Sequence, residues 1–143
     1  MTPPERFIDV SVFVHAYLKP KRPLKPLEAQ IKDAAKKIII RINNGERVIT
    51  SVVHFGEISN ILEDHLPLTD ALSIERALCL RENITVEGVS HEDYISALDE
   101  AERHRVGVND ALAYVVMKKH GLSEIYSFDK DFDKFEDAKR LRA

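Results

Sequence analysis

The sequence contains no tryptophan, one cysteine, five glycines and six prolines among its 143 residues. The single cysteine, Cys79, excludes a disulfide within the chain and is typical of proteins from a reducing compartment. No apolar run approaches the roughly 18 residues of a membrane span, and no signal-peptide pattern opens the chain. We therefore expect a cytoplasmic protein with no membrane association.

The overall composition is that of a folded globular protein. Hydrophobic residues make up 44% of the chain and charged residues 31%, which excludes a disordered or fibrous protein. The length predicts a single domain over residues 1–143. A net charge of −3 argues against a nucleic-acid partner, but this argument weakens if several of the acids bind metal ions.

Short apolar segments alternate with helical patterns along most of the chain. Strands are predicted at residues 6–10, 47–51, 84–86 and 124–128, with a closing strand within 137–141. Helices are predicted from residue 12 to a point before Pro20, and over 27–42, 53–62, 69–80, 91–105 and 109–120. In the second of these helices Lys32 is expected on the solvent face. The alternation predicts an α/β protein, a three-layer α/β/α sandwich with a central, mostly parallel sheet.

Several helix ends carry capping signals. Asn109 is an N-cap type of residue, followed by Asp110 in the first turn, and Gly121 closes that helix. Ser51 and Ser90 can start the two helices that follow them. At the first helix, Asp9 or Ser11 is the expected cap.

Four acids stand at comparable points of this pattern: Asp9, Glu57, Asp110 and Asp129. The carboxyl ends of parallel strands meet at one edge of a sheet, so these side chains can face a single crevice. Carboxylates gathered there either bind cations or become partly protonated. All-oxygen ligands favour Mg²⁺ or Mn²⁺. The plainer alternatives are that Asp9 and Asp110 only cap helices and that Glu57 is a surface residue.

With their flanking residues, these acids resemble the motifs of the PIN-domain family over nearly the whole chain. Residues 7–11, FIDVS, are similar to the opening acid followed two positions later by Ser, Thr or Asn. Residues 50–57, TSVVHFGE, look like the segment that carries the second acid. Residues 109–113, NDALA, and 127–132, SFDKDF, resemble the third and final motifs. Val10 departs from the small polar residue that is common at its position.

The resemblance implies a Mg²⁺- or Mn²⁺-dependent endoribonuclease that hydrolyses RNA phosphodiester bonds. Asp9, Glu57, Asp110 and Asp129 would hold one or two ions. Asp131 either reaches the metal through a water or caps the following turn. Hydrogen bonds to the carboxylates or to the metal's waters are expected from Ser11, Ser127 and Asn109.

The resemblance further implies the toxin of a VapBC-type toxin–antitoxin pair, acting as a homodimer. An antitoxin segment would cover the acidic crevice and place a basic side chain among the carboxylates. The amphipathic helices 27–44 and 53–62 either supply grooves for it or use their apolar faces in the core, which is the more common case. Two alternatives are a PIN nuclease of RNA processing and a non-catalytic scaffold that binds RNA or protein. The basic segment 19–25 is either a solvated connector or an edge that tracks phosphates.

Other metal and phosphate motifs are absent. Residues 129–140 begin like an EF-hand loop, but Lys134 stands where glycine is needed and Arg140 where the bidentate glutamate belongs. The six histidines show no zinc-binding spacing, and there is no glycine-rich phosphate loop. We expect most of the histidines to be surface or packing residues.

Overall fold

A computed structural model describes residues 6–18 and 20–142. The helices are α1 (Val10–Tyr17), α2 (Pro26–Asn43), α3 (Val52–His65), α4 (Leu68–Cys79), α5 (His91–His104) and α6 (Val108–Lys119), with a short 3₁₀ helix η1 (Lys130–Lys134). The strands are β1 (Arg6–Ile8), β2 (Val48–Ser51), β3 (Ile84–Glu87), β4 (Glu124–Tyr126) and β5 (Lys139–Leu141). Every predicted strand is present, and the predicted closing strand is β5. β1 and β4 end two residues earlier than predicted, β2 begins one residue later, and β3 ends one residue later.

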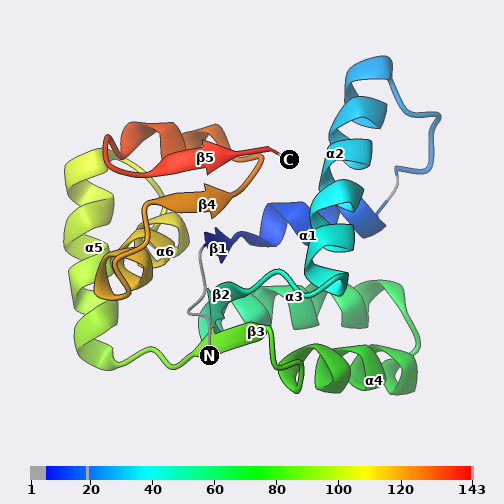
Figure 1. Ribbon diagram of the computed structural model, residues 1–143, viewed down its shortest axis with the longest axis horizontal. Helices are drawn as coiled ribbons and strands as arrows, with labels where there is room; N and C mark the ends of the chain where they lie inside the picture. Colours follow the sequence, from blue (N-terminus) through cyan, green and yellow to red (C-terminus); the bar gives the residue numbers. More distant parts are fainter. Residues whose placement is uncertain (1–5, 19, 143) are drawn as a thin grey trace.

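All five strands are parallel, in the order β3-β2-β1-β4-β5. The first strand in the chain is therefore the central one, with β2 and β4 as its neighbours. Figure 1 shows α5 and α6 together on one side of the molecule and α1 with α2 on the other. This is the predicted α/β/α arrangement with a parallel sheet.

Successive residues of the inner strands point to opposite faces of the sheet, and each face has its own core. Phe7, Ile49 and Ile125 pack with α6 on one face. Ile8 and Tyr126 pack with α1 and α2 on the other. Strands buried on both sides must be apolar throughout, which is why the sequence shows short continuous apolar runs rather than alternation.

Lys32 of α2 lies inside the protein, contrary to its predicted place on the solvent face. It is only 6% exposed, and its Nζ donates hydrogen bonds to the carbonyl oxygens of His15, Ala16 and Leu18 at 3.1–3.2 Å. These carbonyls close the C-terminal end of α1, where helical partners are missing. A cation there also complements the helix dipole, so Lys32 fixes α1 against α2.

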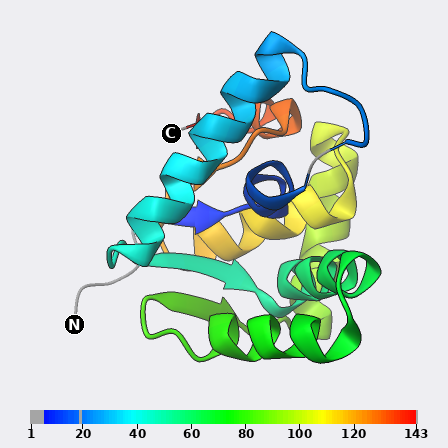
Figure 2. The same ribbon diagram turned by 90° about the vertical axis from the view of Figure 1, so that its right-hand side faces the viewer.

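α3 and α4 lie side by side beyond the β2–β3 edge of the sheet (Figure 2). Ser51 caps α3 and Ser90 caps α5 through their side chains, as predicted. Among the described residues, no helix is long and apolar enough to cross a membrane.

Candidate functional site

Asp9 and Ser127 follow the neighbouring strands β1 and β4 at their carboxyl ends. The backbone N–H of Asp9 donates to the carbonyl of Tyr126 at 3.0 Å, which extends the pairing of the two strands by one step. The strand order thus brings the start of the chain beside its last quarter. Residues 118 positions apart share one end of the sheet.

The Asp9 carboxylate is buried and held by two hydroxyl groups. Its Oδ2 accepts hydrogen bonds from Ser11 Oγ at 2.7 Å and from Ser127 Oγ at 2.8 Å. The same two hydroxyls accept the backbone N–H groups of Phe128 and Asp129, both at 3.0 Å. Asp9 occupies the N-cap position of α1, yet its side chain makes no capping bond. Its carboxylate is therefore oriented by the two serines and is not used to cap the helix.

Three further carboxylates gather beside it. Asp110, Asp129 and Asp131 each offer an oxygen, and these oxygens lie within 4.8 Å of one another. Asp129 caps η1 by accepting the N–H of Asp131 at 2.9 Å, so the capping role considered for Asp131 belongs to Asp129 instead. Asp131 also pairs with Lys134 at 3.4 Å. Asp9 and Glu57 lie outside this group of three, although both belong to the wider set.

The pKa values report the crowding of these acids. Burial, followed by the charges of Asp129, Asp9 and Asp131, raises the pKa of Asp110 to about 7. Burial and the charge of Asp9 also raise the pKa of Glu57, although the hydrogen bond from Asn109 opposes this. The charge of Asp9 therefore acts on both Glu57 and Asp110. We call these five residues, Asp9, Glu57, Asp110, Asp129 and Asp131, the acidic site.

Asn109 does not cap α6. The helix begins one residue earlier, at Val108, with Gly107 in the N-cap position. The side chain of Asn109 instead donates from Nδ2 to Glu57 Oε1 at 2.6 Å, and so links α6 to α3. Glu57 is half-buried and paired, which is not the environment of an ordinary surface glutamate.

His54 is a residue of this region that the sequence reasoning missed. It is 2% exposed and contacts both Ser51 and Asn109. Burial lowers its pKa, against the hydrogen bond to Asn109 and the charge of Asp9. The signal available in the sequence was its spacing, because His54 and Glu57 are three residues apart and share one face of a helix.

The donors of the acidic site fit a hard divalent cation. All are carboxylate oxygens, the ligands preferred by Mg²⁺ and Mn²⁺, and the charges of Asp129 and Asp131 contribute to the raised pKa of Asp110. A bound cation would remove that repulsion. Among the described residues, no lysine or arginine forms a salt bridge with Asp9, Glu57, Asp110 or Asp129.

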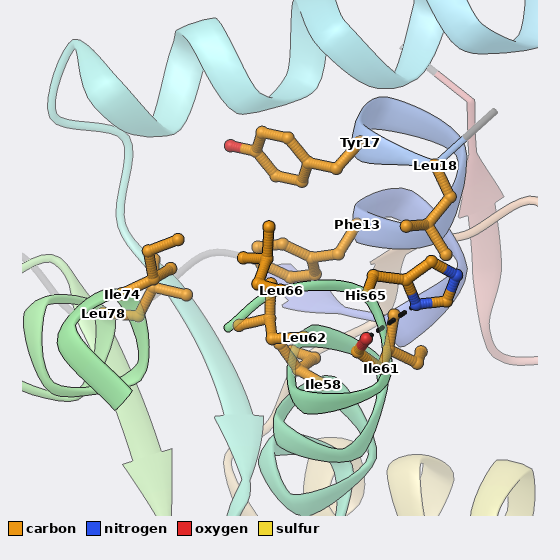
Figure 3. A pocket seen from close by; sticks show the side chains of 10 residues that line it. All are labelled: Phe13, Tyr17, Leu18, Ile58, Ile61, Leu62, His65, Leu66, Ile74 and Leu78. Atoms are coloured by element: carbon orange, nitrogen blue, oxygen red, sulfur yellow. Dashed lines mark hydrogen bonds between the residues drawn. The ribbon is translucent and has the colours of Figure 1, made fainter. Parts of the chain in front are cut away.

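An apolar pocket of about 580 Å³ lies between α1, α3 and α4. Figure 3 shows Phe13 and Tyr17 of α1 facing Leu62 and Leu66, with Ile74 and Leu78 of α4 on the opposite side. None of the residues that line it belongs to α2. Of the two helices considered for a groove, α3 lines this pocket, whereas apolar residues of α2 pack in the core, which is the alternative considered for it.

The fold and the acidic site together define an α/β/α protein with a candidate divalent-cation site at the carboxyl ends of a parallel sheet. The chain belongs to the PIN domain family, whose profile matches residues 6–138. A comparison with curated protein sequences finds no match.

Solved structures share the fold. VapC20 of Mycobacterium tuberculosis, described as a toxin that cleaves the sarcin–ricin loop, has a TM-score of 0.69 and 23% identity, covering 90% of this chain and 93% of that one. VapBC2 of Rickettsia felis, bound to a promoter DNA fragment, has a TM-score of 0.63 and 11% identity, covering 95% of this chain and 96% of that one. VapBC-1 of nontypeable Haemophilus influenzae gives 0.63 and 14% over the same shares. At these identities the likeness concerns the fold.

Proposed function

We propose that this protein is a Mg²⁺- or Mn²⁺-dependent endoribonuclease and the toxin of a VapBC-type toxin–antitoxin pair. The observation that carries the proposal is the convergence of Asp110, Asp129 and Asp131, beside Asp9, in a PIN domain. The toxin described as cleaving the sarcin–ricin loop has the same fold over 93% of its length.

Asp9, Glu57, Asp110 and Asp129 would hold the metal, with Asp131 reaching it through a water. When bound, a Mg²⁺ or Mn²⁺ ion supplies Lewis-acid polarisation of the phosphoryl oxygen and of the attacking water. The chain's own contribution is orientation. Ser11 and Ser127 donate hydrogen bonds to Asp9 Oδ2 and so fix the orientation of this carboxylate.

Proton occupancy of Asp110 decides whether the site can receive a cation. With a pKa of about 7, this carboxyl is partly protonated at neutral pH in the metal-free protein. A ligating carboxylate must be ionised, so metal binding and proton release are coupled at Asp110. Metal affinity is therefore expected to rise with pH around neutrality.

A cleavage assay on total RNA tests the proposal. The wild type is expected to cleave RNA with Mg²⁺ or Mn²⁺, and excess EDTA is expected to abolish cleavage. Asp110→Asn is expected to lower the rate at least about 100-fold, since it removes a charged ligand from the reacting centre. Asp33→Asn, which changes an exposed acid on α2, serves as the matched control and should leave the rate unchanged. Cleavage that persists in EDTA, or in Asp110→Asn at the wild-type rate, would contradict the proposal.

The apolar pocket is the proposed docking site for the antitoxin. Its lining residue Ile58 follows Glu57 on α3, so a partner segment running along this helix would reach both the pocket and the acidic site. An amphipathic helix suits such a pocket, and a basic side chain would complement the unpaired carboxylates.

The biological role has its own readout. Induced expression in the cytoplasm should stop growth, and coexpression of the protein encoded next to it should restore growth. RNA cleavage in vitro without any effect on growth would instead favour a role in RNA processing.

A homodimer is also proposed, because α5 exposes Tyr94, Ile95 and Leu98 on its surface.

A further inference from the structure

Residue His54 lies at the junction of α3 and α6. Its ring is buried, with Phe7 packed edge-on against it at 5.1 Å between ring centroids. Its Nε2 lies 2.8 Å from the carbonyl oxygen of Asn109, and its Nδ1 lies 2.6 Å from Ser51 Oγ. A carbonyl can only accept, so Nε2 carries the proton and donates it to Asn109. In the neutral ring Nδ1 is then the acceptor, and the Ser51 hydroxyl donates to it.

Glu57, one turn further along α3, also binds Asn109. Its Oε1 accepts a hydrogen bond from Asn109 Nδ2 at 2.6 Å. His54 and Glu57 are three residues apart and lie on one face of the helix. His54 therefore bonds to the backbone of Asn109, and Glu57 bonds to its side chain. We call Ser51, His54, Glu57 and Asn109 the Asn109 clamp.

The clamp holds the first turn of α6, whose N-cap position makes no side-chain capping bond. The N-cap, Gly107, has no side chain to cap the helix. Asp110 is the residue that follows Asn109 and belongs to the same helical turn. Fixing Asn109 at two points therefore fixes the position of Asp110 relative to Asp129 and Asp131.

We propose that His54 is a positioning residue of the acidic site: through Asn109 it sets the place of Asp110 for cation binding. This rests on the proposed function, because it assumes that the site holds a divalent cation. His54 is too deeply buried to exchange protons with a substrate, so its part is to orient and not to react. The inference gives a role to a residue that lies within segment 50–57 but is not one of the acids of the site.

Mn²⁺ binding by calorimetry tests the proposal, with His54→Leu, His54→Gln and His120→Gln compared against the wild type. Glutamine carries an N–H donor at about the reach of Nε2, whereas leucine has none. His120 lies at the opposite end of α6 and is the matched control. His54→Leu is expected to weaken Mn²⁺ binding about 10- to 100-fold, which is the usual cost of losing a partner that orients a ligand. His54→Gln should recover most of this loss, and His120→Gln should bind as the wild type does.

A purely structural role for His54 gives a different pattern. It would lower the unfolding temperature without separating leucine from glutamine in Mn²⁺ affinity, and that result would overturn the proposal. So would a folded His54→Leu protein with wild-type affinity. If His54→Leu does not fold, His54→Phe, which keeps an aromatic ring but has no N–H donor for the Asn109 carbonyl, should weaken binding about tenfold, and unchanged affinity would overturn the proposal.

Failure of the proposed function is recognised separately. A wild type that neither binds Mn²⁺ nor cleaves RNA would remove the metal site but leave the clamp open to measurement by NMR. In that case His54→Leu should shift the backbone amide signal of Asp110 while His54→Gln leaves it near its wild-type position. An Asp110 signal that stays in place in His54→Leu would overturn the clamp itself.

Discussion

The two ends of the sheet treat their acids in opposite ways. At the amino ends of the strands, Glu46 and Glu124 both pair with Arg6, at 2.7 Å and 3.2 Å, and Tyr126 donates to Glu46. At the carboxyl ends, no lysine or arginine in the part of the chain that the structure describes forms a salt bridge with Asp9, Glu57, Asp110 or Asp129, and the pKa of Asp110 rises to about 7.

This difference separates a structural use of charge from a functional one. A part-buried acid that only supports the fold is neutralised by its neighbours, because an unpaired charge in such a place is costly. In the acidic site most of the carboxylates have no such partner among the described residues, so that cost remains. Electrostatic strain of this kind is expected where a cation from outside completes the arrangement.

The largest expected effect comes from giving the carboxyl end the cation that the amino end already has. Mn²⁺ at a hundredfold excess over its dissociation constant should raise the free energy of unfolding by about 2.7 kcal/mol. Thermal unfolding with and without Mn²⁺ measures this, and EDTA should reverse it. Asp110→Asn should show a much smaller gain. An equal gain in both proteins would mean that the ion binds elsewhere.

Removing the cation from the amino end should make the two ends alike. Arg6→Met leaves Glu46 and Glu124 part-buried and without their ion pair, at a cost of about 2 kcal/mol allowing for their partial exposure. Urea unfolding measures the loss. RNA cleavage by the folded protein should be unchanged, since Arg6 lies at the far end of its strand. A loss of cleavage equal to that in Asp110→Asn would show that the two ends are not independent.

The smallest predicted effect is the pH dependence of stability without metal. The pKa of Asp110 is raised in the folded protein to about 7, so the folded state binds more protons than the unfolded state between about pH 4 and 7. Stability from this group is therefore lost as pH rises through that window, by about 1–2 kcal/mol after allowance for solvent screening. Urea unfolding at several pH values should show the decline, and Asp110→Asn should flatten it. The difference between the two proteins isolates Asp110 from His54, whose lowered pKa acts in the opposite direction.

Much of this arrangement is written locally in the sequence. The βα rhythm predicts the parallel sheet, and parallel strands bring their carboxyl ends to one edge, which is enough to predict that acids after those strands meet. Ser51 and Ser90 cap their helices because capping depends on residues only three positions away.

What the sequence left out depends on distant partners. Asn109 has the chemistry of a cap, but Glu57, 52 positions away, takes its side chain. Lys32 has the pattern of a surface residue, but three carbonyls at the end of α1 bind it inside. In the basic segment, Arg22 is held by both oxygens of Glu28 at 2.7 Å and 2.8 Å, which favours the connector over a phosphate-tracking edge at that residue. Lys19 of the same segment lies outside the described residues.

The position of β1 at the centre of the sheet has a consequence for synthesis of the chain. β1 gains its second neighbour only when residues 124–126 have been made, more than a hundred residues later. Pairing across such a separation is slow, because the intervening chain must first be ordered. A growing or truncated chain therefore has an open sheet centre and also lacks Asp129 and Asp131. The acidic site is among the last parts of the molecule to assemble, so an unfinished chain does not yet carry a complete one.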